Sequence, residues 1–320
     1  MVVLYLTSLA SGAGKTGMAA AIGKQLLNQN KKVGYLRPSV GIMGDGNDTA
    51  VLKRFLALQE SEESLSPVFP DEGALITGLK TALARTSGET DFAIIEGTSG
   101  LGQGAVEAAS SVDAKVIGVE SYAESLQSVA SHYKEMGKRL AGVVMNKIPG
   151  SRVARVKGDF QKELPDVRLL GAVPEDRSLI GMNVNELAES LKGTIVSGSA
   201  NLSTVVANIM LAAMNPDHGP EYYSIKENKA VIVRSERPDM QLAALETPTT
   251  CLVLAGEQPP IQMVVRRAEA KNIPIVSTKE DVKATVARIE SALKEARLDD
   301  RRIAGLAALI AKHLDFAAFL

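Results

Sequence analysis

Residues 7–17 read Thr-Ser-Leu-Ala-Ser-Gly-Ala-Gly-Lys-Thr-Gly, and they join an apolar run at 2–6 to an alanine-rich run at 16–27. The short apolar run predicts a buried strand, and the longer run predicts a helix. Backbone N–H groups of a glycine-rich turn and the positive end of a helix dipole together attract phosphate. The stretch therefore predicts a phosphate-binding loop, in a variant form that has Leu9 where the standard spacing has glycine. The plainer alternative is a turn that only connects the strand to the helix.

The loop also predicts roles for individual side chains. The Lys15 ammonium is expected to reach the β- and γ-phosphates of a nucleotide, and the Thr16 hydroxyl is expected to ligate Mg²⁺. The residues expected to contact the nucleotide here are Ser11, Gly12, Ala13, Gly14, Lys15, Thr16 and Gly17.

Carboxylates for the metal ion are expected from two further stretches. Residues 91–100, Asp-Phe-Ala-Ile-Ile-Glu-Gly-Thr-Ser-Gly, predict an apolar strand that ends in Glu96. This is a Walker B arrangement, in which the acid binds Mg²⁺ directly or through water; an ordinary strand-end acid is the alternative. Asp48 is either a third metal ligand or the N-cap of a helix that starts at Thr49. Asp45 is a further candidate.

The rest of the chain predicts two α/β domains and a tail. Apolar runs at 33–36, 92–95, 115–119 and 142–145 alternate with helical patterns, as in a doubly wound, mostly parallel sheet covered on both faces. We expect this domain to span residues 1–180, followed by a smaller α/β domain at 181–296. Residues 297–320 form a helical tail rich in alanine and leucine, whose pattern leaves open whether it packs on the core or on a partner.

Composition excludes several classes of function. The 320 residues carry a formal net charge of −1, so no basic surface for nucleic acid or acidic membrane is indicated. No uninterrupted apolar run reaches the ~18 residues of a membrane span. The single cysteine, Cys251, cannot form an intramolecular disulfide, which fits a reducing cytoplasm. His132, His218 and His313 lack partners at metal-ligand spacing.

Five motifs occur in an order that points to a known family. They are the loop at 7–16, Arg37-Pro38, Ile-Ile-Glu-Gly at 94–97, Val-Met-Asn-Lys at 144–147, and Leu-Gly-Ala-Val-Pro-Glu-Asp at 170–176. Together they resemble the dethiobiotin synthetase-like P-loop domain, which is similar to cobyrinic acid a,c-diamide synthase and to the N-terminal part of long bacterial phosphate acetyltransferases. The resemblance covers residues 1–180. The remainder resembles a DRTGG domain, through Arg-Ser-Glu-Arg-Pro-Asp at 234–239 and the segments at 254–260 and 272–277.

The resemblance implies ATP as the nucleotide. It places Asn146 against the adenine and Pro174 and Glu175 over the base, and position 149 is proline, where a guanine-reading motif has aspartate. It also implies a homodimer. Arg37 replaces the lysine that faces the substrate in dethiobiotin synthetase, and Leu9 and Ala10 replace a threonine and an aspartate. The substrate pocket is therefore expected to differ.

Three functions follow from these features. The first is a cytoplasmic protein that binds ATP and Mg²⁺ while its second domain senses a ligand or partner. The resemblance implies that an acyltransferase domain would follow, but the chain stops at Leu320. No acetyl transfer is therefore expected. The second is an ATP-dependent ligase that activates a carboxylate or carbamate, or a slow ATPase, with Lys15 and Arg37 as catalytic residues. The third is a regulatory subunit of a separate phosphate acetyltransferase. Arg234, Arg237 and Asp239 are either a site for a small anionic ligand or a solvated charged turn.

Overall fold

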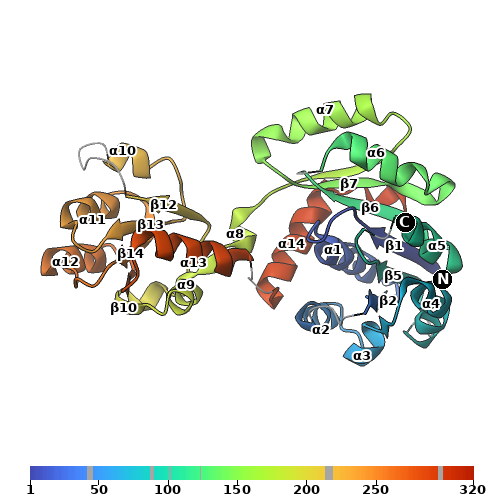
Figure 1. Cartoon of the computed structure of the whole chain (residues 1–320), viewed down its shortest axis with the longest axis horizontal. Coiled ribbons are helices and arrows are strands. Elements are labelled where there is room, and N and C mark those ends of the chain that lie inside the picture. The colour runs from blue at the N-terminus through green and yellow to red at the C-terminus, as the bar shows by residue number, and fades with distance from the viewer. Residues whose placement is uncertain (42–45, 87–89, 101, 123, 213–218, 295–297) are drawn as a thin grey trace. The chain divides into compact units, whose positions relative to one another are not determined.

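The computed structural model describes residues 1–320 except 42–45, 87–89, 101, 123, 213–218 and 295–297 (Figure 1). The sequence candidates Asp45 and His218 lie outside the described residues. The chain divides into two compact units. The first comprises Met1–Glu175 together with the C-terminal tail, and the second begins at Asp176 and ends with helix α13 (Val282–Lys294).

The first unit is built on a six-stranded parallel sheet with helices on both faces, which confirms the predicted doubly wound fold. Its strand order is β2 (Val33–Leu36), β5 (Phe92–Glu96), β1 (Val2–Thr7), β6 (Lys115–Ser121), β7 (Leu140–Ile148), β8 (Leu169–Pro174). Two-residue strands β3 (Ser39–Val40) and β4 (Val68–Phe69) pair beside it. Its helices are α1 (Lys15–Asn28), α2 (Gly46–Phe55), α3 (Glu62–Leu65), α4 (Glu72–Thr86), α5 (Gln103–Ser111), α6 (Leu126–Lys134), α7 (Val153–Glu163) and α14 (Asp300–His313).

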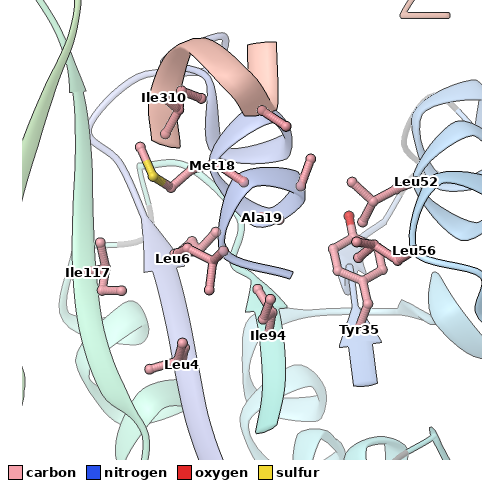
Figure 2. Packing of buried hydrophobic residues seen from close by; sticks show 14 of the residues in the cluster. Leu4, Leu6, Met18, Ala19, Tyr35, Leu52, Leu56, Ile94, Ile117 and Ile310 are labelled. Atoms are coloured by element: carbon pink, nitrogen blue, oxygen red, sulfur yellow. The ribbon is translucent and has the colours of Figure 1, made fainter. Parts of the chain in front are cut away.

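The tail helix α14 completes the hydrophobic core of this unit. Ile303 and Ile310 are buried in the same cluster as Leu4, Leu6 and Met18, and Figure 2 shows Ile310 lying against α1. Gly17 permits this approach, because a Cβ there would lie 3.3 Å from the Ile310 side chain. Further along the tail, Leu314 is buried and its backbone bridges to Gly171 of β8. The tail thus packs on the core of its own chain, directly behind the start of α1.

The second unit is a smaller α/β sandwich around a five-stranded sheet, as predicted. The strand order is β10 (Thr194–Ser197), β15 (Ile275–Thr278), β14 (Thr249–Ala255), β13 (Lys229–Arg234), β12 (Asn208–Leu211), and only β10 is antiparallel to its neighbour. One core contains side chains from α10 (Gly219–Tyr223), α11 (Pro238–Leu245) and α12 (Gln262–Ala270); the other contains side chains from α9 (Val184–Ser190) and α13 (Val282–Lys294). The unit also holds α8 (Arg177–Ile180) and the pair β9 (Met182–Asn183) and β11 (Val205–Val206).

Among the described residues, no helix combines the length and the apolar character needed to cross a membrane.

Candidate functional site

The phosphate loop has the backbone shape that an anion-binding turn requires. Gly12 and Gly14 have φ angles of 72° and 104°, in the left-handed region that favours glycine. A Cβ at Gly14 would also lie 2.2 Å from Asn146 Nδ2. Helix α1 begins at the next residue, and its cap, Gly14, provides no side chain to the amides of the first turn. Those N–H groups and the helix dipole therefore face the loop, where an anion would satisfy them.

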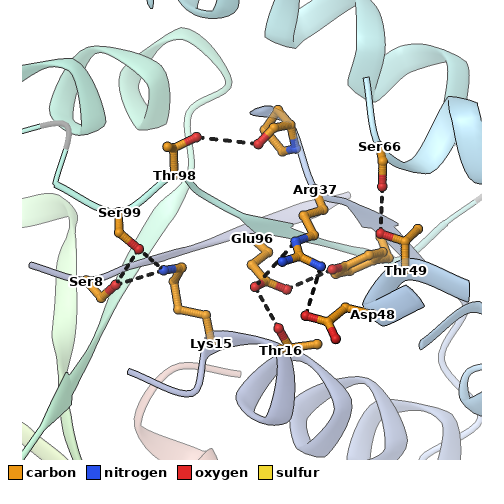
Figure 3. A network of polar contacts seen from close by, with 12 residues as sticks. Ser8, Lys15, Thr16, Arg37, Asp48, Thr49, Ser66, Glu96, Thr98 and Ser99 are labelled. Atoms are coloured by element: carbon orange, nitrogen blue, oxygen red, sulfur yellow. Dashed lines mark hydrogen bonds and ion pairs between the residues drawn. The ribbon is translucent and has the colours of Figure 1, made fainter. Parts of the chain in front are cut away.

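The Lys15 ammonium lies inside this loop and is held by hydroxyl groups. Its Nζ donates to Ser8 Oγ at 2.8 Å and to the hydroxyl of Ser99, and the two hydroxyl oxygens lie 3.1 Å apart (Figure 3). The side chain is buried, and this burial lowers the pKa of the ammonium. Among the described residues, no carboxylate forms an ion pair with Lys15. The loop thus holds a buried cation whose direct partners are neutral.

The three predicted metal ligands come together beside Lys15, and a guanidinium lies among them. Glu96 accepts hydrogen bonds from Thr16 Oγ1 and from the Tyr35 hydroxyl, both at 2.8 Å. Arg37 Nε lies 3.8 Å from Glu96 Oε1, and its Nη1 donates to Asp48 Oδ2 at 3.1 Å. Figure 3 shows the Arg37 side chain reaching both carboxylates. This arginine partly neutralises the acids predicted to bind Mg²⁺.

The structure shows whether Asp48 precedes helix α2 as its N-cap or lies within the helix. Helix α2 begins at Gly46, before the position expected from the sequence, so Asp48 lies in its first turn. A carboxylate there is favoured by the helix dipole, and this one also pairs with Arg37. The N-cap of a helix starting at Thr49 is therefore not its structural role.

These side chains line one cavity of about 420 Å³. From the phosphate loop, the lining includes Ser11, Gly12, Gly14, Lys15 and Thr16, and the charged side chains of Arg37, Asp48 and Glu96 also line the cavity. The hydroxyl-bearing residues Ser39, Thr49, Ser66, Thr98 and Ser99 line it too, together with Pro38 and Gly97. The cavity offers an ammonium, backbone amides and a carboxylate pair, which is the chemistry of a magnesium–phosphate site.

The residues expected to contact the base lie outside this cavity. Asn146, near the end of β7, donates from Nδ2 to the backbone oxygen of Ala13 at 2.8 Å, and so braces the phosphate loop from behind. Pro174 ends the neighbouring strand β8 and pairs with Ile148, to whose oxygen the Glu175 N–H donates. The adenine contacts of Asn146, Pro174 and Glu175 stay predictions.

Glu120 is a residue at this site that the sequence analysis did not single out. It lies at the carboxyl end of β6 with none of its surface exposed. Its Oε1 accepts the Leu9 N–H at 2.9 Å and the Tyr133 hydroxyl at 2.5 Å, whereas its Oε2 has no hydrogen-bond partner among the described residues. The signal available was the one that identified Glu96, an acid ending an apolar strand. Glu120 holds the first half of the phosphate loop against the sheet.

Burial raises the pKa of the Glu120 carboxyl because it disfavours the charged form. An acid with a raised pKa in the folded state contributes stability that is present below its unfolded pKa and lost as pH rises through the folded value. We therefore expect the stability of Glu120→Gln, which retains the acceptor oxygen, to rise relative to that of the wild type as pH increases from about 5 to about 8. Urea unfolding followed by circular dichroism at both pH values measures the difference. The exposed Glu107→Gln is the matched control; a parallel pH dependence in wild type and Glu120→Gln would contradict the expectation.

Comparison with known proteins identifies both units. A family model described as an AAA domain matches residues 3–183, and a model described as a DRTGG domain matches residues 186–292. The first match covers more than half of the chain. The order of the two domains is the one expected from the sequence motifs.

Curated relatives match most of the chain or a part of it. A phosphate acetyltransferase of Synechocystis sp. is 23% identical over 76% of this chain and 39% of its own length. That of Nitratidesulfovibrio vulgaris is 22% identical over 98% of this chain and 50% of its own length. An ATP-dependent dethiobiotin synthetase of Methanococcus vannielii is 30% identical over 31% of this chain and 52% of that protein. The chain thus spans half or less of the length of the phosphate acetyltransferases it matches.

Proposed function

Because the chain belongs to the dethiobiotin synthetase-like P-loop family of AAA domains, here followed by a DRTGG domain, we propose that it binds ATP with Mg²⁺ and acts as a nucleotide-dependent regulatory protein. One observation carries the proposal: the buried Lys15 ammonium has only neutral hydroxyl partners, at the start of a helix without a side-chain cap. Keeping a buried cation without an anionic partner is unfavourable. A bound polyphosphate would supply the missing negative charge.

In this proposal, each side chain of the cavity has a separate task. Lys15 and the loop amides bind the terminal phosphates, and Ser8 and Ser99 orient the ammonium toward them. Thr16 and Glu96 hold Mg²⁺, with Asp48 as a further carboxylate. When bound, the ion screens the negative charge of the phosphates.

The state of Arg37 favours regulation over substrate activation. A ligase of the dethiobiotin synthetase type needs a free cation to orient a substrate carboxylate, whereas Arg37 is paired with Asp48 and lies beside Glu96.

The alternative function, ATP-dependent activation of a carboxylate or carbamate, is supported by the cavity, which both Arg37 and Lys15 line. In a screen of small carboxylic acids, a sharp rise in phosphate release with one acid would support the ligase. Slow, acid-independent hydrolysis would support the regulatory function.

Selection of the base is the second test of this proposal. We expect ATP to bind at least about tenfold more tightly than GTP, equivalent to ~1.4 kcal/mol. The reason is that Pro149 stands where a guanine-reading motif needs a carboxylate. Competition between the two nucleotides at a fixed Mg²⁺ concentration measures this ratio. Equal affinities would refute the adenine assignment while leaving the phosphate site intact.

The same proposal includes two protein partners, a second copy of the chain and an acyltransferase. The family resemblance supports a homodimer, and the phosphate acetyltransferase relatives support an acyltransferase as the partner of a regulatory subunit.

A further inference from the structure

A second cavity, of about 760 Å³, opens at the carboxyl edge of the sheet in the second unit. It lies between helix α13 and the ends of strands β12, β13 and β14, and α13 contacts β13. Helices α11 and α12 cover one face of this sheet and α13 covers the other. Open α/β sheets bind ligands at such an edge, where successive connections pass to opposite faces. The volume is also that of a small-molecule site.

Two cations line this cavity without an ion-pair partner in the described part of the chain. Arg234 ends β13, and Lys283 lies in the first turn of α13. The neighbouring Arg237 differs, because its guanidinium pairs with Asp239 at 2.7 Å and it does not line the cavity. Of the three residues considered in the sequence for anion binding, only Arg234 therefore faces this space. An anionic group of a ligand would neutralise it together with Lys283.

The remaining lining offers acceptors and an apolar wall. Glu236, Asp281 and Glu290 supply carboxylates. Asp281 already accepts the Ala284 N–H at 2.7 Å, so it caps α13 and keeps that helix end from being a phosphate site. The apolar wall consists of Leu211, Val282, Val286 and Ala287. Of these carboxylates, Glu236 follows the end of β13, Asp281 precedes α13 and Glu290 lies within α13. Carboxylate oxygens accept hydrogen bonds from sugar hydroxyls, and an apolar wall suits the face of a base.

We propose that this cavity binds a nucleoside monophosphate. The phosphate lies at Arg234 and Lys283, the sugar hydroxyls donate to the carboxylates, and the base packs on the wall formed by α13 and Leu211. Two cations beside three carboxylates favour a single phosphate over a triphosphate tail, because additional negative charge would be repelled. The site is separate from the phosphate loop and does not depend on it.

The test uses the full chain with Lys15→Ala, which removes the loop's ammonium. Calorimetric titration with AMP is expected to show one site per chain. Adding Arg234→Ala is expected to weaken AMP binding by about tenfold or more, since a charge-assisted contact to phosphate is lost. Arg237→Ala is the matched control and should leave AMP affinity unchanged. Inorganic phosphate alone should bind more weakly than AMP, because it cannot use the apolar wall.

Several results would overturn the assignment. These are no heat with AMP in folded Lys15→Ala protein, equal losses in the Arg234→Ala and Arg237→Ala chains, or phosphate binding as tightly as AMP. If Arg234→Ala does not fold by circular dichroism, Lys283→Gln tests the same pair of cations with the same expected loss. ATP binding by the wild-type phosphate loop is measured separately, so either site can fail alone.

Discussion

Lys15→Ala is expected to weaken ATP binding by about 100-fold or more, because contacts from a buried ammonium to phosphate contribute about 3 kcal/mol. Lys15 is the cation that Ser8 and Ser99 direct into the cavity. Its loss leaves the terminal phosphates with the backbone amides and the Mg²⁺ ion, but without a cationic side chain from the loop. Calorimetric titration with ATP and Mg²⁺ measures the effect.

Replacing Lys15 should weaken ATP binding without lowering the stability of the protein measured in the absence of nucleotide. Burial lowers the pKa of Lys15, which means that folding disfavours its charged form. Lys15→Met, which retains an unbranched side chain, should therefore be at least as stable as the wild type in urea and still fail to bind ATP. Lys24→Ala, in an exposed position of the same helix, is the control and should bind normally. Full ATP affinity in folded Lys15→Ala protein would remove the basis of the proposed function.

Local sequence was sufficient to predict the strand, loop and helix that form the candidate phosphate site. Each element there is specified by neighbouring residues: the apolar run of β1, the glycines with positive φ, and the alanine-rich helix α1. Likewise, the apolar run that ends in Glu96 places that acid at the carboxyl edge of a parallel sheet. Parallel strands bring such edges together, so Glu96 and Thr16 could be expected to meet.

The same sequence patterns could not predict which segments far apart in the chain contact each other. The apolar stripe of the tail shows that α14 buries one face, but not that Ile310 packs beside Gly17. Glu120 and Glu96 both end apolar strands, yet one binds the Leu9 amide and the other lies beside Arg37. Which partner each acid meets depends on strand order, and strand order is a property of the whole sheet.

Metal binding should become tighter when Arg37 is replaced. The guanidinium bridges Asp48 and Glu96, so Mg²⁺ has to compete with a cation that the protein already holds there. We expect Arg37→Met to tighten binding of Mn²⁺, a magnesium substitute visible by electron paramagnetic resonance, by about tenfold, equivalent to ~1.4 kcal/mol. The same substitution leaves two partly buried carboxylates without their cation, and should lower the free energy of unfolding by about 1–3 kcal/mol.

The two readouts together separate competition from simple loss of structure. If Arg37→Met damages the site, the protein should bind metal more weakly and unfold more easily. If the substitution only removes the competing cation, the protein should bind metal more tightly although it unfolds more easily. Arg54→Met is the control, because Arg54 pairs with Asp300 in an exposed position away from the cavity. Its metal affinity should equal that of the wild type. Unchanged or weaker Mn²⁺ binding by folded Arg37→Met protein would show that the arginine does not occupy the place of the metal, and that its pairing with Asp48 is structural.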